Sequence, residues 1–499
     1  MKVKINWLRS SFWAGLILIC GAPRFLAAFL LANPDGDEYS YVTQVEMMRA
    51  NLAAGTFTLK GFFGFWLPMY QFISAVVCLV IDHPAYVSKA VAAVFGVGIC
   101  LLVYRLTLKL TGRRAFAILA FLLIALNPLH ILYSAYTVTD VPHAFFVLAS
   151  LYFAAEKRWI LAASFAAAAM SFRLESWMLI GLLPMLQLFV ERKVSPVMLV
   201  ILIIVPLLWL YICWDTTGNA LEYFDSRNRY IVWLIAGFPA LKNPSLQRIE
   251  TDIGRLIYAA NPAVIMGCFA GAWFVGRELI RAKFARVSEN IFAVLAALAY
   301  FFALLGFLLL AYFTRNQTDI WDRYGLINFA LGVPVLAWTF AAIEDRKPYL
   351  ARMLAIPALI LCLNDLQCQI GDIPDYIQQG KPQQIIANKL WARFEENPNM
   401  RFFCDDAGVR VLSGVPKEKF LVSSDSPLDK EMFLTYLKEN GVQYLVCADD
   451  EESTPAKLFP EMRSGGVNEH FRLSAPEITK DWHGQVWLYR FGQPPAKSG

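Results

Sequence analysis

The sequence predicts an all-α polytopic membrane domain of about eleven transmembrane helices, followed by a small C-terminal α/β domain. Hydrophobic residues make up 57% of the 499-residue chain and charged residues only 17%, whereas soluble domains carry about 25% charged residues. The apolar residues form runs of about 20, the length that crosses a bilayer as a helix. From residue 367 the composition changes to charged residues, Pro and Gly, and no run of that length follows.

This change in composition divides the chain into a transmembrane domain, residues 1–366, and a soluble domain, residues 367–499. Spanning segments are expected at residues 12–32, 85–108, 115–135, 141–155, 158–172, 174–190, 196–214, 261–280, 291–313, 325–343 and 349–366. Lys2, Lys4 and Arg9 precede the first segment, and no small-residue cleavage site follows it. We therefore expect a retained first helix rather than a removed signal peptide.

A twelfth apolar segment, residues 66–82, decides on which side of the membrane every later loop lies. Five loops are rich in Lys and Arg: Lys109–Arg114, Glu156–Arg158, Glu191–Lys193, Arg277–Arg286 and Glu344–Arg352. Positive loops favour the cytoplasmic side, and all five lie there only if 66–82 does not span. We therefore expect 66–82 to be a re-entrant or interfacial helix. Loops 33–84 and 215–260 and the domain 367–499 are then extracytoplasmic.

The soluble domain shows alternating helix and strand patterns. Helices are predicted at Gln383–Glu396 and at Leu428–Asn440, where Gly441 suits a C-terminal cap. Short runs of β-branched and aromatic residues predict four strands, at Arg401–Cys404, Val409–Leu412, Val442–Ala448 and Gln485–Phe491. A small α/β domain is the simplest fold for this order.

Several function classes lack support in the sequence. It contains no GxxxxGK, HExxH or Rossmann glycine motif, so nucleotide-dependent and zinc-protease activities are not indicated. The nine cysteines form no CxxC pair, and most lie in or beside apolar runs, which argues against a disulfide or zinc framework. The net charge of +5 comes with basic residues placed between apolar runs, so it indicates topology and no nucleic-acid partner.

The sharpest acidic cluster is Asn33–Tyr41, directly after the first apolar run, where Asp37 and Glu38 are adjacent and flanked by aromatic residues. Charged groups at a membrane boundary are costly and suggest function. One carboxylate beside an acceptor hydroxyl can act as a general base, and two or three can bind a divalent cation. The alternative is a solvated Asp-Gly-Asp turn in which Glu38 is an N-terminal helix charge.

Three further clusters fall at predicted helix ends on the same face. Asp140 and His143 open one segment, and Asp140 is either a site residue or an N-cap. Arg173 precedes another segment and can hold a phosphate bidentately, or pair with Glu175. Arg323 is a second phosphate candidate, and snorkelling to lipid headgroups is its alternative role. His143 is a possible metal ligand, although a lone His at a helix start is more often structural.

The order of these motifs resembles the GT-C membrane glycosyltransferases, in the branch of protein O-mannosyltransferases and lipid A aminoarabinose transferase. The resemblance spans residues 10–345 and rests on Gly36–Tyr39, Leu67–Tyr70, Tyr104–Arg114, Asn127-Pro128, Thr137–Asp140 and Arg323-Tyr324. The sequence departs from the aminoarabinose transferase at Gly36, where that enzyme has His. It also has Phe65–Pro68 where that enzyme has Glu-Lys-Pro before the embedded helix.

This resemblance implies a polyprenyl-phosphate-linked sugar as donor, and transfer to a lipid, glycan or protein hydroxyl outside the cytoplasm. It makes Asp37 the essential residue and the expected base, and it gives Asp140 a role in binding metal or orienting the acceptor. We therefore expect Asp37, Glu38 and Asp140 to be catalytic, and Arg173 and Arg323 to bind the donor phosphate. A divalent cation is a possible cofactor, with Asp37, Asp140 and His143 as its candidate ligands.

Two other function classes fit a polytopic chain with these carboxylates. A secondary transporter would use them as ion or proton sites, but transporters place such charges near the bilayer midplane and often show inverted repeats. Here the charges lie in predicted loops, and no repeat is visible. A non-catalytic scaffold whose C-terminal domain binds a partner is the third class. The enzyme is favoured over both.

Overall fold

The computed structural model describes most of the chain. The described residues are 7–34, 36–237, 244–281, 288–314, 320–378, 380–422, 426–448, 454–464, 466–467, 470–473, 480–481 and 484–492. Lys2, Lys4 and part of the predicted basic loop Arg277–Arg286 lie outside them.

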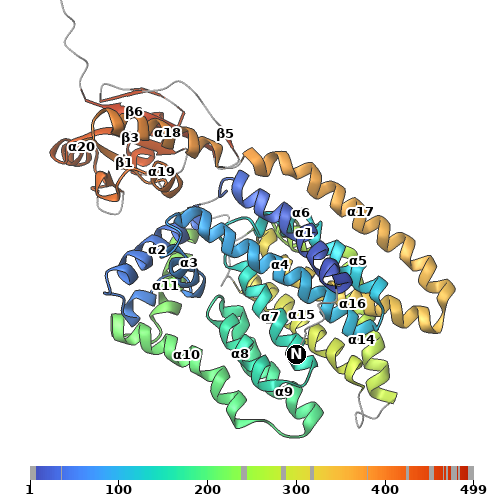
Figure 1. Cartoon of the computed structure of the whole chain (residues 1–499). Coiled ribbons are helices and arrows are strands. Elements are labelled where there is room, and N and C mark those ends of the chain that lie inside the picture. The colour runs from blue at the N-terminus through green and yellow to red at the C-terminus, as the bar shows by residue number, and fades with distance from the viewer. Residues whose placement is uncertain are drawn as a thin grey trace, which may run out of the picture. The chain divides into compact units, whose positions relative to one another are not determined.

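The chain divides into two compact units (Figure 1). The first unit consists of Met1–Leu30 and Val45–Gly371, and the second of Leu31–Gln44 and Asp372–Gly499. The acidic cluster around Asp37 thus belongs to the same compact unit as the C-terminal residues.

Helices make up residues 7–378 almost entirely. In chain order they are α1 (Trp7–Leu30), α2 (Gly36–Ala53), η1 (Leu59–Phe62), α3 (Met69–Cys78), α4 (Pro84–Thr111), α5 (Arg114–Ala125), α6 (Pro128–Tyr133), α7 (Asp140–Ala155), α8 (Trp159–Met170), η2 (Leu174–Met178), α9 (Leu179–Glu191), α10 (Pro196–Thr217), α11 (Glu222–Gly237), α13 (Leu246–Ala260), α14 (Pro262–Arg281), α15 (Glu289–Phe313), η3 (Asp322–Tyr324), α16 (Gly325–Arg346) and α17 (Pro348–Gln378).

Eight helical segments among the described residues are long and apolar enough to cross a membrane. They are Ser11–Leu30, Pro84–Thr111, Leu174–Glu191, Pro196–Thr217, Pro262–Arg281, Glu289–Phe313, Asp322–Arg346 and Pro348–Asp375. Shorter apolar helices are Met69–Cys78, Arg114–Ala125, Asp140–Ala155 and Trp159–Met170. At about 1.5 Å per residue, the ten-residue helix α3 is shorter than a core of about 30 Å. The 12-residue helices α5 and α8 are shorter as well, so the non-spanning character of 66–82 stays a prediction.

The helices of the first unit pack around α16, whose most apolar stretch is 83% buried. Helices α4, α7, α15 and α16 lie side by side (Figure 1). Helix α14 approaches α16 closely through two glycines. A Cβ on Gly332 would lie 2.3 Å from Val264, and one on Gly267 would lie 2.3 Å from Leu336. Small residues at such contacts are the usual means by which membrane helices pack.

The structure corrects the predicted single span 115–135. The helix breaks between α5 and α6 because Pro128 has no N–H to donate, and Asn127 adopts an extended conformation and caps α6 by accepting from the His130 N–H at 2.8 Å. The break interrupts the helical hydrogen bonding of the carbonyls at the end of α5, where Ile124 O still accepts from the Asn127 N–H at 3.4 Å. Buried Arg24 of α1 donates to two of them, Ala125 O at 3.0 Å and Ile124 O at 3.1 Å.

The predicted loop 215–260 also differs, because it contains α11 and α13. Ser245 caps α13 by accepting from the Arg248 N–H at 3.2 Å. The many charged residues of α11 and α13 made the segment look like a loop in the sequence. Helices with charged residues on one face are typical of amphipathic segments at a membrane surface.

The second unit contains a mixed sheet in the strand order β2-β1-β3-β6-β4, with β5 paired to β6. The elements are α18 (Lys381–Glu396), β1 (Arg401–Cys404), α19 (Ala407–Leu412), η4 (Lys417–Lys419), β2 (Phe420–Leu421), α20 (Lys430–Glu439), β3 (Val442–Ala448), α21 (Thr454–Leu458), η6 (Pro460–Ser464), β4 (Phe471–Leu473), β5 (Lys480–Asp481) and β6 (Gly484–Phe491). Strand β1 is parallel to β2 and β3, and β6 is antiparallel to β3 and β4.

Each face of this sheet has its own hydrophobic core because side chains alternate along a strand. Phe403 packs on one face with Phe433 of α20, and Phe402 packs on the other with Leu390 of α18. The predicted strands at 401–404 and 442–448 are confirmed. The predicted strand Val409–Leu412 is wrong, because Asp406 accepts from the Val409 N–H at 2.8 Å and thereby caps a helix.

Candidate active site

Four of the predicted site residues line one small pocket of the first unit: Asp140, His143, Arg173 and Arg323. Glu175 and Tyr324 line it as well, and its apolar wall consists of Leu304, Leu308 and Ile327. Charged residues from the starts of α7, η2 and η3 therefore meet, although Asp140 and Arg323 are 183 positions apart in the chain. Two carboxylates and two guanidiniums face the pocket, so their formal charges cancel.

Helix starts position these side chains. Asp140 is the first residue of α7, and Pro142 in the first turn is pre-organised for a helix because its φ is fixed. Arg173 has an extended backbone, with φ −149° and ψ 145°, and directly precedes η2, which carries Glu175. Arg323 lies in η3, just before α16.

Arg173 is held between the two carboxylates. Its Nη1 donates to Asp140 Oδ1 at 2.7 Å, and its Nη2 and Nε donate to the two oxygens of Glu175 at 2.8 and 3.3 Å. The pair with Glu175 is thus bidentate, whereas Asp140 has a single contact. The guanidinium carbon also lies 5.1 Å from the centre of the Tyr324 ring, and that of Arg323 lies 5.7 Å from it. Both distances suit cation–π attraction.

Burial alone would lower the pKa of the Arg173 guanidinium, but the neighbouring charges of Asp140 and Glu175 outweigh it and raise that pKa above its ordinary value. The side chains of Arg173, Asp140 and Glu175 are 18%, 8% and 13% exposed, so little water screens the three charges. His143 is buried beside them, and its Nε2 shares a hydrogen bond with the Ser176 hydroxyl.

Helix α11 brings Arg227 close enough to interact electrostatically with Glu175 and Tyr324 of the pocket. Burial would lower the pKa of Arg227, but its hydrogen-bonded neighbour Tyr223, together with Glu175 and Tyr324, raises it above its usual value. Packing of α11 against η2 is aromatic, with the Phe224 and Trp177 ring centres 6.2 Å apart.

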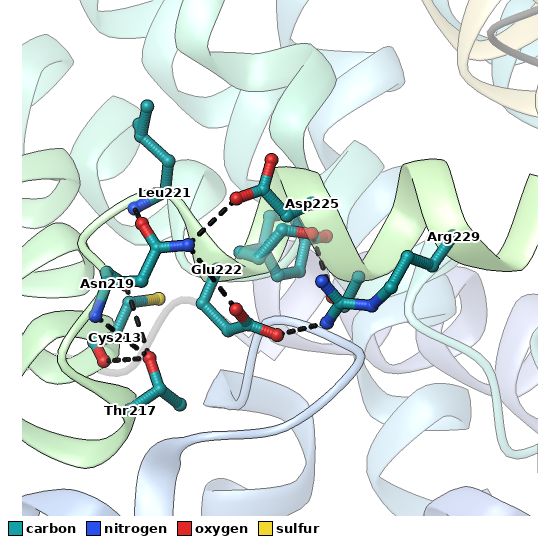
Figure 2. Close-up of polar contacts among 9 residues, drawn as sticks. Cys213, Thr217, Asn219, Leu221, Glu222, Asp225 and Arg229 are labelled. Carbon is teal, nitrogen blue, oxygen red and sulfur yellow. Dashed lines mark hydrogen bonds and ion pairs between the residues drawn. The ribbon is translucent and has the colours of Figure 1, made fainter.

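A polar turn sets the direction of α11 (Figure 2). The Asn219 side chain accepts from the Leu221 N–H at 3.0 Å and donates to Asp225 at 2.8 Å. Thr217 donates to the Cys213 carbonyl at 2.8 Å, and Arg229 pairs with Glu222, which lies two turns before it at the start of the helix. The network fixes the first turns of α11, and Arg227 lies on its second turn.

Asp37 and Glu38 lie in the first turn of α2, in the second compact unit. Negative charge there is favoured by the helix dipole. Glu38 is only 2% exposed and Asp37 is half-buried, so the two adjacent side chains have different surroundings. A turn surrounded by solvent, the alternative to a functional site, does not describe Glu38. The catalytic roles of Asp37, Glu38 and Asp140 stay predictions.

No group of three or more His, Cys, Asp or Glu side chains that could hold a metal ion is found in the part of the chain that the structure describes. Asp140 and Glu175 face the same pocket but both bind Arg173, and His143 contacts Ser176. As they lie, these side chains do not form a coordination sphere.

Three residues near the pocket were not predicted as site residues. Glu175 was expected only as an ion-pair partner of Arg173, and that pair is present together with the contact to Asp140. Tyr324 follows Arg323 directly, so its position in the chain was the available signal. Arg227 lies 54 residues from Arg173 in the chain, and its charge alone did not distinguish it from its neighbours in the loop.

Charged side chains thus gather at helix starts around a small pocket in a bundle of apolar helices. The sequence model of the family described as dolichyl-phosphate-mannose-protein mannosyltransferase matches residues 47–241. No curated protein sequence matches the chain.

Three solved structures share the fold of this chain. ArnT from Cupriavidus metallidurans in the apo state has a TM-score of 0.57 and 11% identity, covering 97% of this chain and 98% of that one. ArnT bound to undecaprenyl phosphate has a TM-score of 0.53 at 11% identity, covering 96% and 98%. The apo oligosaccharyltransferase of Archaeoglobus fulgidus has a TM-score of 0.52 at 11% identity, covering 99% and 76%.

At this identity the structural likeness establishes the fold. The chain has the GT-C fold, which confirms the resemblance drawn from its motifs. Together with the family match, the fold indicates a multi-pass membrane glycosyltransferase.

Proposed function

We propose that the protein transfers a sugar from a polyprenyl-phosphate donor to an acceptor hydroxyl on the extracytoplasmic face, with Asp37 as general base. The observation that carries the proposal is the meeting of Asp140, Arg173, Glu175 and Arg323 around one pocket at the helix ends. The matching family is described by a dolichyl-phosphate donor, and ArnT has been solved with undecaprenyl phosphate. Both likenesses support an isoprenoid-phosphate donor for this chain.

The reaction needs one base and stabilisation of a phosphate leaving group. Asp37 takes the proton of the acceptor hydroxyl, whose oxygen forms a bond to the anomeric carbon. The bond from that carbon to the phosphate oxygen breaks, and polyprenyl phosphate leaves with the electron pair. Guanidiniums placed where negative charge develops stabilise the transition state, and Arg binds phosphate oxygens in a bidentate geometry. Arg173 and Arg323 have this role in the proposal.

The contacts of Arg173 suggest how the donor enters. Three of its five N–H groups already donate to two carboxylates, and in the proposal a phosphate oxygen replaces one of these contacts. Asp140 is held by one hydrogen bond and Glu175 by two, so Asp140 is the carboxylate that the donor displaces. Release of Asp140 on donor binding then makes its carboxylate available to orient the acceptor.

A divalent cation stays part of the proposal, with Asp37, Asp140 and His143 as the candidate ligands. Asp140 binds Arg173 through Oδ1 alone, and release from Arg173 would make both of its carboxylate oxygens available to the cation. Transfer by purified protein in the presence of EDTA tests this directly. Full activity after chelation removes the cation from the mechanism, and activity restored by added Mg²⁺ or Mn²⁺ retains it.

Donor use is the test of the proposed function. Purified full-length protein in lipid nanodiscs is given undecaprenyl-phosphate and dolichyl-phosphate sugars, with cell-envelope lipids and glycans from a deletion strain as acceptors. We expect the release of free polyprenyl phosphate with at least one donor, together with a glycosylated product. A protein that releases polyprenyl phosphate from no donor of this class would contradict the proposal.

A further inference from the structure

The acidic segment, residues 31–44, belongs to the second compact unit together with residues 372–499, which are called the C-terminal unit below. Its described residues pack on helices of that C-terminal unit and do not form a free loop. Asn33 and Tyr39, on either side of Asp37 in the chain, are 1% and 2% exposed. The Tyr39 hydroxyl donates to the Asn33 carbonyl at 3.2 Å, so the residues on both sides of Asp37 are also tied to one another.

The first contact is between Asn33 and the start of α18. Gly380 occupies the N-cap position of α18 with φ +73°, a backbone conformation that glycine adopts without strain. A Cβ at this position would lie 2.6 Å from the Asn33 carbonyl oxygen and 3.0 Å from the Ala32 Cβ. The nearest atom belongs to the backbone, so no side-chain rotation relieves the contact. Only glycine fits here while the segment keeps its position.

The second contact is between Tyr39 and the start of α19. A Cβ on Gly408 would lie 2.9 and 3.0 Å from two ring carbons of Tyr39. Asp406 caps α19 beside it, and its Oδ1 would be 3.1 Å from the same Cβ. The Tyr39 ring therefore lies directly against the backbone of the first turn of α19.

We propose that the C-terminal unit positions the general base: α18 and α19 hold Asn33 and Tyr39, and thereby fix the backbone on both sides of Asp37. This rests on the proposed function, in which Asp37 accepts the proton. A base must lie within hydrogen-bond reach of the hydroxyl it deprotonates. A misplacement of about 1 Å can cost roughly 10²-fold in rate even when it arises far from the chemistry. Gly380, Gly408 and Tyr39 are therefore positioning residues.

Glycine substitutions separate positioning from folding. Gly380→Ala and Gly408→Ala should each lower the kcat for transfer by about tenfold or more, and leave the KM for the polyprenyl-phosphate donor within about twofold. Gly441→Ala is the matched control. Gly441 has φ +66°, close to that of Gly380, but a Cβ there would meet no atom within 4 Å. The Gly441→Ala variant therefore has the same kind of backbone strain as Gly380→Ala, but its Cβ contacts no neighbouring atom.

A double-mutant cycle tests the contact itself. Tyr39→Leu removes the ring that a Gly408 Cβ would meet, so Gly408→Ala should lower kcat less in the Tyr39→Leu background than in the wild type. Tyr39→Phe keeps the ring and should retain more activity than Tyr39→Leu. Thermal unfolding of the full chain is recorded for every variant, and the comparison is made among those that melt within about 2 °C of the Gly441→Ala control.

The outcomes are distinct. A selective fall in kcat at Gly380 and Gly408, with coupling between Gly408 and Tyr39, supports positioning by the C-terminal unit. If wild-type protein transfers sugar and the folded Gly380→Ala and Gly408→Ala variants do so at the rate of Gly441→Ala, positioning is refuted while the proposed function stands. Additive effects of Gly408→Ala and Tyr39→Leu would also refute it. A wild-type protein that uses no donor refutes the proposed function instead.

Discussion

Arg173 holds Asp140 by a single hydrogen bond of 2.7 Å while binding Glu175 through two. The arginine is thus a shared partner of two buried carboxylates at the ends of different helical elements. Removal of Arg173 leaves both carboxylates without their cationic partner. Removal of one carboxylate leaves the other paired with Arg173.

Loss of the shared guanidinium should destabilise the fold. Arg173→Met leaves two buried carboxylates uncompensated, and breaking a buried pair in this way costs about 3–5 kcal/mol. The double variant Arg173→Met/Glu175→Gln should recover part of this loss because one unpaired charge is removed. Thermal unfolding of the purified protein measures both. Arg229→Met is the control, since that arginine is 64% exposed and exposed pairs contribute at most about 1 kcal/mol. Equal melting temperatures for all three variants would contradict the role of Arg173.

Replacement of a planar guanidinium by the compact ammonium group of lysine should impair use of the donor. Arg173→Lys and Arg323→Lys keep the charge and lose the planar geometry that matches a phosphate. Each should raise the KM for a polyprenyl-phosphate sugar about tenfold, because a charge-assisted hydrogen bond contributes about 1.5–3 kcal/mol. Steady-state kinetics over a range of donor concentrations checks this. Wild-type donor kinetics in both variants would remove the two arginines from the site.

The break between α5 and α6 should depend on Arg24. Arg24→Met removes this donor from the carbonyls of Ala125 and Ile124, and Ile124 O retains the Asn127 N–H. A buried carbonyl left unsatisfied costs about 1–3 kcal/mol. The melting temperature should fall, whereas the KM for the donor should not change among molecules that remain folded. Arg105→Met is a suitable comparison because Arg105 is exposed, with its guanidinium carbon 4.7 Å from the centre of the Trp13 ring. A melting temperature as high as that of the comparison variant would show that the carbonyls find other partners.

Cysteine labelling tests the topology on which the extracytoplasmic site depends. Met432 of α20 is 61% exposed and Lys193 lies exposed in a predicted cytoplasmic loop. In a Cys368→Ser background, a membrane-impermeant maleimide should label Met432→Cys in intact cells and Lys193→Cys only after permeabilisation. We expect this pattern because the predicted cytoplasmic loops carry an excess of Lys and Arg, which favours the cytoplasmic side. The reverse pattern would place the C-terminal unit in the cytoplasm and overturn the proposed face of transfer.

Local patterns in the sequence were sufficient for many elements. Strands 401–404 and 442–448 were predicted with the bounds that the structure has, because alternating side chains meet a core on each face. Val409–Leu412 has a strand-like composition as well, but a cap three residues earlier makes it helical. The Asn127-Pro128 break was visible in the sequence, whereas its partner Arg24 lies about 100 residues away, and no local pattern connects them.

The candidate site was predictable to the extent that charges stand at helix ends. Asp140, Arg173 and Arg323 were selected on that ground, and they line one pocket. The division of Arg173 between two carboxylates was not predictable, because it depends on the packing of α7 against neighbouring helices. The same holds for the acidic segment, whose contacts with Gly380 and Gly408 join residues more than 340 positions apart.

Asp37 is the general base in the proposed reaction, and an Asp37→Asn variant removes its ability to accept a proton. Adjacent side chains on a helix point in different directions, and Glu38 is buried while Asp37 is half-buried, so the two should not share one role. Loss of a general base costs about 10²–10⁴-fold in rate.

The measurement is glycosylated product formed by purified, folded protein with a polyprenyl-phosphate donor. Asp37→Asn should form no detectable product, Asp140→Asn an intermediate amount, and Glu38→Gln more than Asp37→Asn. Melting temperatures equal to the wild type exclude misfolding as the cause. Wild-type product formation by Asp37→Asn would contradict the account, because the acidic segment would then carry no catalytic group.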